Sequence, residues 1–246
     1  MTPQLWHDLG VGLWETLYSS VLATLFAFII GLPIGVILAI TDRGGLKQNL
    51  VINKILGIIV NILRSIPFLI LFFLIIPFTR LIVGTSIGTP ATIVPLTIAA
   101  APFIARLVET SVKEVDAGVI EAALSFGTPT VKIIFKAILP EIIPSLIANA
   151  AIALVTVIGY SSMMNFCGGG GLGAVAINNG YYRSNTTVMY IAVAIIIVLV
   201  QVFQELGLLL AKKLNRRKKS DSSKIGIIKR LIKKIKDKDI KGETQL

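Results

Sequence analysis

Long stretches without a charged side chain constrain this chain more than any other feature of its sequence. The first, residues 16–41, lies between Glu15 and Asp42 and is uncharged throughout. About 20 apolar residues in an α-helix cross the hydrocarbon core of a bilayer, where every backbone polar group must be paired within the chain. Only 15% of the 246 residues are charged, against about 25% in soluble domains. The sequence therefore predicts an all-α integral membrane protein.

Five apolar stretches are predicted to span the membrane: residues 16–41, 55–79, 90–108, 141–164 and 188–211. Gly31, Pro33 and Gly35 interrupt the first stretch, where they either kink the helix or let it approach a neighbour closely; we favour close packing. The third stretch is rich in Ala, Thr and Pro. Small residues favour contacts inside a helix bundle over exposure to lipid.

The second stretch contains an arginine, Arg64, followed by Ser65-Ile66-Pro67. A charged side chain at the bilayer centre costs about 3 kcal/mol on insertion scales. Two interpretations remain open. Arg64 either lies near the cytoplasmic end and extends to the surface, or it faces the bundle interior beside a helix break at Pro67.

The segment between the third and fourth spans, residues 109–140, carries seven charged side chains and is expected to protrude from the membrane. Asp116 is a plausible N-cap and Gly127 a plausible stop for a short helix over residues 117–126. Thr128-Pro129 then turns the chain, and residues 131–139 are expected to form a second short helix. A small rigid helix outside the membrane suits docking to a partner protein; an amphipathic helix lying on the membrane is the alternative.

The spacing Glu121-Ala122-Ala123, three residues, Gly127, eleven residues, Leu139-Pro140 resembles the EAA signature of importer-type ABC transporter permeases. One departure is Ala137, where the family pattern has isoleucine. The resemblance implies that the short helix is a coupling helix that docks into a cytoplasmic ATPase. Glu121, Ala122, Ala123 and Gly127 are then the expected docking residues.

Further strings resemble the methionine-type permeases of this family. They are RSIPF, LPEIIPSL, VIGYS, GGLG at residues 170–173 and NNGYY at residues 178–182. The resemblance covers residues 14–213 and leaves residues 214–246 as a separate tail. It implies a type I ABC importer fold with five transmembrane helices, working as a homodimer by alternating access. A permease for another small amino acid is the alternative within this class.

The resemblance also implies the partners and the place of the nucleotide. Two cytoplasmic ATPase subunits would bind ATP and Mg²⁺, and an extracytoplasmic methionine-binding protein or lipoprotein would deliver D- or L-methionine. No cofactor is expected on this chain, and it lacks the Gly-Lys-Ser/Thr ending of a phosphate-binding loop. We accordingly predict a transport subunit and not an enzyme.

Polar residues recur along the fourth predicted span. Asn149, Thr156 and Tyr160 fall at helical spacing, which fits either hydrogen bonding between helices or the lining of a solute path. We expect Tyr160, Ser161, Ser162 and Met163 to contribute to the translocation pathway or its gate.

Basic residues predict the orientation in the membrane. Lys and Arg concentrate in the 42–54 loop, the 105–140 region and the tail, and none precedes residue 16. The positive-inside rule places the N-terminus outside and the coupling segment and C-terminus in the cytoplasm of a bacterial cell. Residues 224–238 have the pattern of a basic amphipathic helix suited to an anionic lipid surface; a partly disordered, solubilising tail is the alternative.

Two other function classes fit the sequence less well. An intramembrane enzyme needs clustered Asp, Glu, His or Cys within the bilayer, but the predicted spans contain no Asp and no His. His7 and Cys167 are the only residues of their types, so we expect no metal site. A purely structural assembly subunit would not need the coupling segment. The net charge is +11, and most of the basic residues lie toward the C-terminal end. We attribute this charge to orientation in the membrane and to anionic lipid, and we expect no nucleic-acid partner.

Overall fold

The computed structural model describes the backbone of residues 3–243 and the side chains of residues 3–166 and 168–215. Within that part the chain is helical, in the order α1 (Pro3–Thr41), α2 (Leu50–Ser65), α3 (Phe68–Leu74), α4 (Ile76–Val83), α5 (Thr89–Lys113), α6 (Ala117–Ser125), α7 (Thr130–Ile133), η1 (Ile134–Ile138), α8 (Leu139–Ser161), η2 (Met164–Cys167), α9 (Leu172–Val175), η3 (Ala176–Tyr181) and α10 (Thr186–Glu243). The side chain of Cys167 and the basic side chains predicted for the amphipathic tail lie outside this described set.

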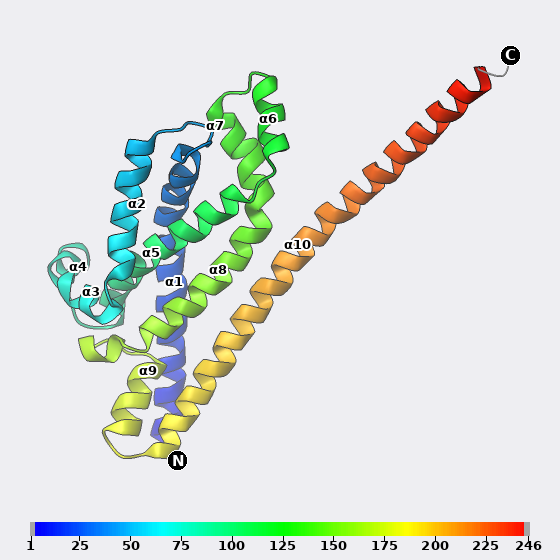
Figure 1. The fold of residues 1–246 in the computed structure, drawn as a ribbon. Helices are drawn as coiled ribbons and strands as arrows, with labels where there is room; N and C mark the ends of the chain where they lie inside the picture. The colour runs from blue at the N-terminus through cyan, green and yellow to red at the C-terminus, as the bar shows by residue number, and fades with distance from the viewer. Residues whose placement is uncertain (1–2, 244–246) are drawn as a thin grey trace.

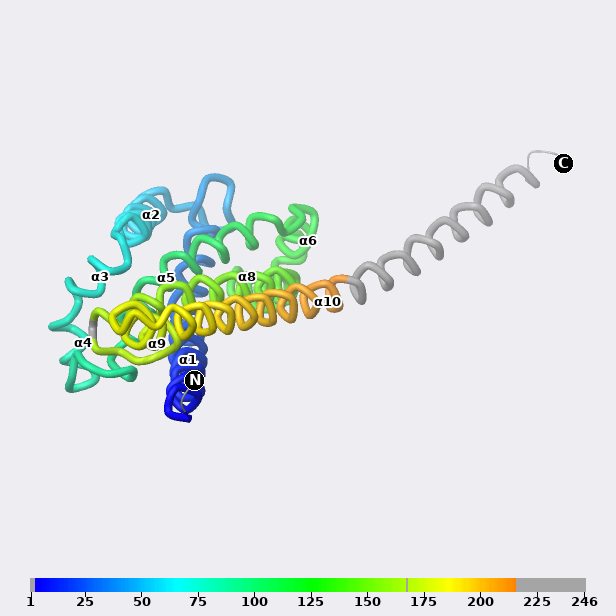
Figure 2. The backbone as a smooth tube through the Cα atoms, turned by 90° about the horizontal axis from the view of Figure 1, so that it is seen from below, coloured from blue at the N-terminus to red at the C-terminus, as the bar shows by residue number. Residues whose placement is uncertain are grey.

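Four helical stretches are long and apolar enough to cross a membrane: Pro3–Thr41, Thr89–Lys113, Thr130–Ser161 and Thr186–Asn215. The pair α2 and α3 meets the same test when counted as one bent span. The all-α prediction is confirmed, and the five predicted spans correspond to these four helices and the bent pair. The start of α1 and helix α6 lie at opposite ends of the bundle (Figure 1). Seen along the bundle, α3 and α4 occupy one flank and α6 the other (Figure 2).

The first helix is longer than predicted. It begins at Pro3, so Asp8 and Glu15 lie within α1 and not before it. The prediction used the absence of charge to place the start of the span, but a helix continues beyond the apolar core as long as its backbone bonds are made. Helix α1 also continues through Pro33.

Helices α1 and α5 pack closely against each other. A Cβ atom on Gly31 would lie 2.7 Å from the carbonyl oxygen of Ala101, and one on Gly35 would collide with the carbonyl oxygen of Ala105. The two glycines therefore let the backbones approach each other, which confirms the close-packing interpretation. On α5, Ile104 is fully buried in the main apolar core.

The second span is broken. Helix α2 ends at Ser65, and α3 begins at Phe68 after a bend of 105°. Pro67 has no N–H to continue the helical ladder, and its ring disfavours a helical conformation at the preceding residue; Ile66 is accordingly extended, with ψ of 123°. A helix break at Pro67, which one of the two interpretations of Arg64 included, is therefore present.

The chain after the turn at Pro129 departs from the prediction. The second short helix does not end before the fourth span, because α7, η1 and α8 run on as one helix over Thr130–Ser161. The π-helical segment η1 makes this continuity feasible: the N–H of Leu139 donates to the carbonyl of Ile134, five residues back. Wider turns of this kind relieve the clash that Pro140 would otherwise make with the preceding turn.

Not all of the charged segment protrudes. Helix α5 extends to Lys113, and Glu109 is buried, with a relative exposure of 7%. Glu109 is therefore packed among the helices and is not a surface residue of the protruding segment. A carboxylate is tolerated inside when cations satisfy it, and Glu109 lies between Arg106 and Lys113.

Candidate functional site

Helix α6 is a separate short helix at the end of the bundle, flanked by α5 and the long helix that begins at Thr130. Its N-terminus is capped as predicted, since the side chain of Asp116 accepts a hydrogen bond of 2.7 Å from the N–H of Gly118. At its other end Gly127 has φ of 65°, in the left-handed region that glycine adopts at helix ends. These two residues fix where α6 begins and where the chain leaves it.

Only one side of α6 packs on the bundle. Ile120 and Ala123 are partly buried against the main core, and no residue of α6 is fully buried. Glu121, Ala122 and Gly127 are exposed. The expected docking residues therefore lie on the accessible surface of α6, apart from Ala123, which contributes to the packed side.

Exposed apolar residues at the end of α6 and just after it were not identified from the sequence. Phe126 is 87% exposed and Leu124 49% exposed, and Val131 of α7 and Phe135 of η1 are each 64% exposed. Apolar side chains gathered on an exposed surface mark protein or membrane contacts. The signal was present in the sequence as four apolar residues between charged ones, but Phe126 was assigned only to the end of the helix.

An ion network holds the helix ends just before α6. Glu109 accepts from Arg106 Nη1 at 2.6 Å and from Lys113 Nζ at 2.8 Å, and Lys113 also binds the carboxylate of Asp42 at 2.5 Å. Arg106 Nη2 donates to the side-chain oxygen of Asn61 at 2.8 Å. The network thus ties α5 to α2 and to the residue that follows α1.

The alternating charges of this network fall at positions 106, 109 and 113. Residues three or four apart on a helix are neighbours, so this spacing is the sequence signal that could have identified the network. Asp42 lies just outside the first apolar span. Hydrogen bonds from Lys113 and from the N–H of Arg43 hold the pKa of Asp42 below its ordinary value of 3.8. Asp42 is therefore an anion at neutral pH.

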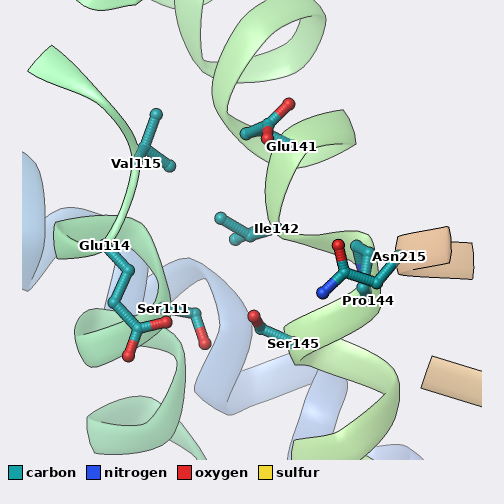
Figure 3. A pocket seen from close by; sticks show the side chains of 8 residues that line it. All are labelled: Ser111, Glu114, Val115, Glu141, Ile142, Pro144, Ser145 and Asn215. Atoms are coloured by element: carbon teal, nitrogen blue, oxygen red, sulfur yellow. The ribbon is translucent and has the colours of Figure 1, made fainter. Parts of the chain in front are cut away.

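Two pockets are both lined by Val115, in the short connection between α5 and α6. One, of about 290 Å³, lies between the loop after α1 and the start of α6, and is lined by Asp42, Lys113 and Ile120 among others. The second, of about 170 Å³, is shown in Figure 3, where Glu114 lies on one wall and Asn215 of α10 on the other. The second pocket marks the junction of α5, α8 and α10. Both pockets place polar groups where α6 joins the bundle.

The four residues expected at the pathway or gate lie together at the end of α8, but they differ in environment. The ring of Tyr160 stacks on Phe68 of α3, with centroids 4.9 Å apart and planes 2° from parallel. Ser161 is buried and its hydroxyl donates to the carbonyl of Ile158. Ser162 is half-buried and Met163 is 44% exposed. Their assignment to a pathway stays a prediction.

The polar residues of α8 differ in how their side chains are hydrogen-bonded. The side-chain amide of Asn149 donates to Ser111 Oγ at 2.9 Å and to the carbonyl of Leu107 at 3.2 Å, so it links α8 to α5. The hydroxyl of Thr156 instead donates to the carbonyl of Ile152 in its own helix. Hydrogen bonding between helices therefore explains Asn149 and not Thr156.

Arg64 lies in the last turn of α2 with an exposed side chain. It follows Lys54 by ten residues, or about 15 Å of helix, which is about half the thickness of a bilayer core of about 30 Å. Its exposed side chain does not face the bundle interior in this structure, although the helix break at Pro67 that accompanied that interpretation is present. The depth of Arg64 in the membrane stays a prediction.

At the end away from α6, Glu15 holds the glycine-rich loop. Its carboxylate accepts from the hydroxyl of Thr89 at 2.9 Å and from the N–H of Gly171 at 2.8 Å. The N–H of Gly170 donates in turn to Thr89 Oγ1 at 3.1 Å. These bonds join the loop to α1 and α5. Glu15 was missed because it was placed before the first helix.

Comparison with known proteins places this geometry among transport components. Residues 31–219 match the protein family described as "Binding-protein-dependent transport system inner membrane component". A curated relative from Vibrio cholerae, the "Probable D-methionine transport system permease protein MetI", is 49% identical over 83% of this chain and 91% of its own length. The protein of the same description from Pasteurella multocida is 46% identical over 88% of this chain and 100% of its own length.

Solved structures show the same fold. A chain of the "MetNI methionine ABC transporter", solved in inward-facing conformations, superposes with a TM-score of 0.85 and 43% identity, covering 87% of this chain and 99% of that one. An amino acid ABC transporter crystallised with histidines superposes with a TM-score of 0.69 at 22% identity over 85% of this chain. At that identity the second likeness concerns the fold alone.

Proposed function

The chain belongs to the family of binding-protein-dependent transport system inner membrane components, and from this premise we propose that it is the permease subunit of an ATP-driven methionine importer. The identity of 49% with a protein described as a D-methionine transport permease carries the assignment of the solute. The match to the methionine transporter over 99% of that chain supports it. A permease for another small amino acid is the alternative.

The proposed complex contains two copies of this chain, two cytoplasmic ATPase subunits and an extracytoplasmic methionine-binding protein or lipoprotein. ATP and Mg²⁺ bind to the ATPase subunits in this proposal. The positive-inside rule orients the chain with α6 and the C-terminus in the cytoplasm and the start of α1 outside. The position of α6 at the end opposite the start of α1 supports this arrangement (Figure 1).

Helix α6 transmits the movement of the ATPase to the bundle. Glu121, Ala122, Ala123 and Gly127 contribute to the docking surface, and the exposed ring of Phe126 is the apolar residue best placed to enter a cleft on the partner. On the other side, Ile120 packs on the main core, and α6 follows α5, whose last turns carry the ion network that joins Asp42 and α2. In this proposal a displacement of α6 reaches the bundle through the packing of Ile120 and through the chain connection to α5.

ATP binding drives the two coupling helices toward each other in this mechanism, and the bundle changes from inward-facing to outward-facing. The ATPase supplies the differential free energy between the two states. Methionine then passes from the binding protein along the interface between the two permease subunits. Tyr160, Ser161, Ser162 and Met163 are proposed to contribute to this pathway or its gate.

Uptake of radiolabelled L- and D-methionine into proteoliposomes tests the proposal. The vesicles contain this chain, its ATPase and its binding protein, and each component is omitted in turn. We expect ATP-dependent uptake that is lost on every omission. ATPase coupling without methionine uptake would retain the permease and reassign the solute, and an absence of ATPase association would refute the coupling role of α6.

A further inference from the structure

An apolar groove lies between α1, α8 and α10. Each helix contributes four residues at spacings of three, four and seven, so each presents one continuous stripe. The stripes run over residues 21–28 of α1, 147–154 of α8 and 203–210 of α10. They enclose about 510 Å³, and seven residues of helix extend over about 10 Å. The groove is thus as long as two helical turns.

The floor of the groove is closed by a contact between α8 and α10. Gly207 of α10 lies so close to Ala151 of α8 that an added Cβ would collide with the alanine methyl group. The rim is apolar and accessible, with Leu25 53%, Leu206 51% and Leu210 52% exposed. A ligand therefore enters from the lipid side and not from the interior of the bundle.

Water does not suit this groove. A buried water needs two to four polar partners, and the hydroxyl of Thr24 is the only polar side-chain group among the lining residues. The Oγ1 atom of Thr24 is itself buried without a hydrogen-bond partner. An occupant of the groove is therefore apolar, and it restores the van der Waals contacts that an empty groove would forfeit.

A positive charge at one end of the groove indicates the class of lipid headgroup that binds there. The stripe on α10 has the residue series 203, 206, 207, 210, and Lys213 follows one turn later on the same face of the helix. Its side chain is exposed. The next positions of the sequence, 216–219, are all basic. A cation one turn beyond an apolar groove matches the phosphate of a lipid whose chain lies in the groove.

We propose that this groove binds one acyl chain of an anionic phospholipid from the inner leaflet, with the lipid phosphate at Lys213. The lipid fills the space between α1 and α10, so both helices contact it along two turns. Apolar packing alone would not select a lipid, because bilayer chains are as apolar as leucine. The selection comes from the charge of the headgroup.

Native mass spectrometry of the full chain in its complex tests the proposal. The complex is extracted in mild detergent, and phosphatidylglycerol or phosphatidylcholine is added. We expect one phosphatidylglycerol to be retained per copy of the chain in preference to phosphatidylcholine. Equal retention of the two lipids would overturn the proposal.

Two matched pairs of variants locate the site. Leu206→Trp fills the groove, whereas Leu209→Trp adds the same ring at a residue 58% exposed outside it. Lys213→Gln removes the charge in line with the groove, and Lys212→Gln removes one about 100° around the helix. We expect Leu206→Trp to abolish retention and Lys213→Gln to weaken it about fivefold, which corresponds to about 1 kcal/mol per basic side chain near the surface.

The same effect from both members of either pair would refute the site. A second copy of the chain is the competing occupant of the groove. Leu206→Cys in a Cys167→Ser background tests it, since disulfide cross-linking between two copies through residue 206 would show that protein covers the groove and would overturn the lipid assignment. Absence of that cross-link, with selective loss of phosphatidylglycerol in Leu206→Trp, supports the proposal.

Discussion

Glu109→Gln is the substitution that most directly tests the ion network before α6. The carboxylate is nearly buried, with its side chain 9% exposed, and it accepts charge-assisted hydrogen bonds of 2.6 and 2.8 Å from Arg106 and Lys113. Glutamine keeps the shape but removes the negative charge between two cations. We expect the protein to fold and to lose stability.

The expected loss is about 2 kcal/mol. Hydrogen bonds to charged groups contribute about 1.5–3 kcal/mol each, and breaking a fully buried ion pair costs about 3–5 kcal/mol. The lower value applies because Lys113 is 44% exposed and its pairing is screened by solvent. Both cations also keep other partners, Asn61 for Arg106 and Asp42 for Lys113.

Thermal unfolding in detergent, followed by circular dichroism, measures this loss. For a chain of this length, 2 kcal/mol corresponds to a decrease in Tm of about 4–8 °C. Glu114→Gln is the matched control, since Glu114 is exposed and follows α5 directly. Combining Glu109→Gln with Arg106→Gln should give a coupling energy of about 1 kcal/mol or more. A Glu109→Gln protein no less stable than the Glu114→Gln control would refute this account of the network.

Three further predictions concern α6 and its connections. Phe126→Ala should reduce ATPase co-purification and methionine uptake by severalfold with little change in Tm, because the ring is 87% exposed; a large fall in Tm would show that it packs within the chain. Gly127→Asp should insert normally but uncouple ATP hydrolysis from uptake, whereas Gly127→Asn, which tolerates positive φ better than most residues, should be milder; normal coupled uptake by Gly127→Asp would contradict the docking role. Since the pKa of Asp42 is lowered by Lys113, its stabilising contribution is present above its ordinary pKa of 3.8 and is lost as pH falls below that value. Asp42→Asn should thus lower Tm at pH 7 and cause no difference at low pH, and an equal difference at both would rule out the ion pair as the cause.

Several features of this protein follow from local sequence alone. The uncharged stretches predict the spans because lipid excludes charges and unpaired backbone groups, and this constraint acts on each segment independently. Asp116 and Gly127 predict the ends of α6 because capping and positive φ are properties of the residues at a helix terminus. Pro67 predicts the break in the second span for the same local reason.

Pairing between distant segments could not be predicted in this way. Glu109 can be buried inside the bundle because the cations at positions 106 and 113 lie beside it. Those cations are in turn held by Asn61 of α2 and by Asp42. Glu15 joins a loop more than 150 positions away, at Gly171. The energy of a charged group is set by its neighbours in space, so its place relative to the membrane cannot be derived from charge alone.

The sequence by itself determined the number of membrane spans, the order of helices around α6 and the residues expected to dock. The tertiary structure decided that α7 and α8 form one helix, that Phe126 at the end of α6 is highly exposed, and that Lys213 follows an apolar groove. The physical reason is the range of the interactions: helix formation and insertion depend on neighbouring residues, whereas exposure, ion pairing and grooves depend on how separate helices pack.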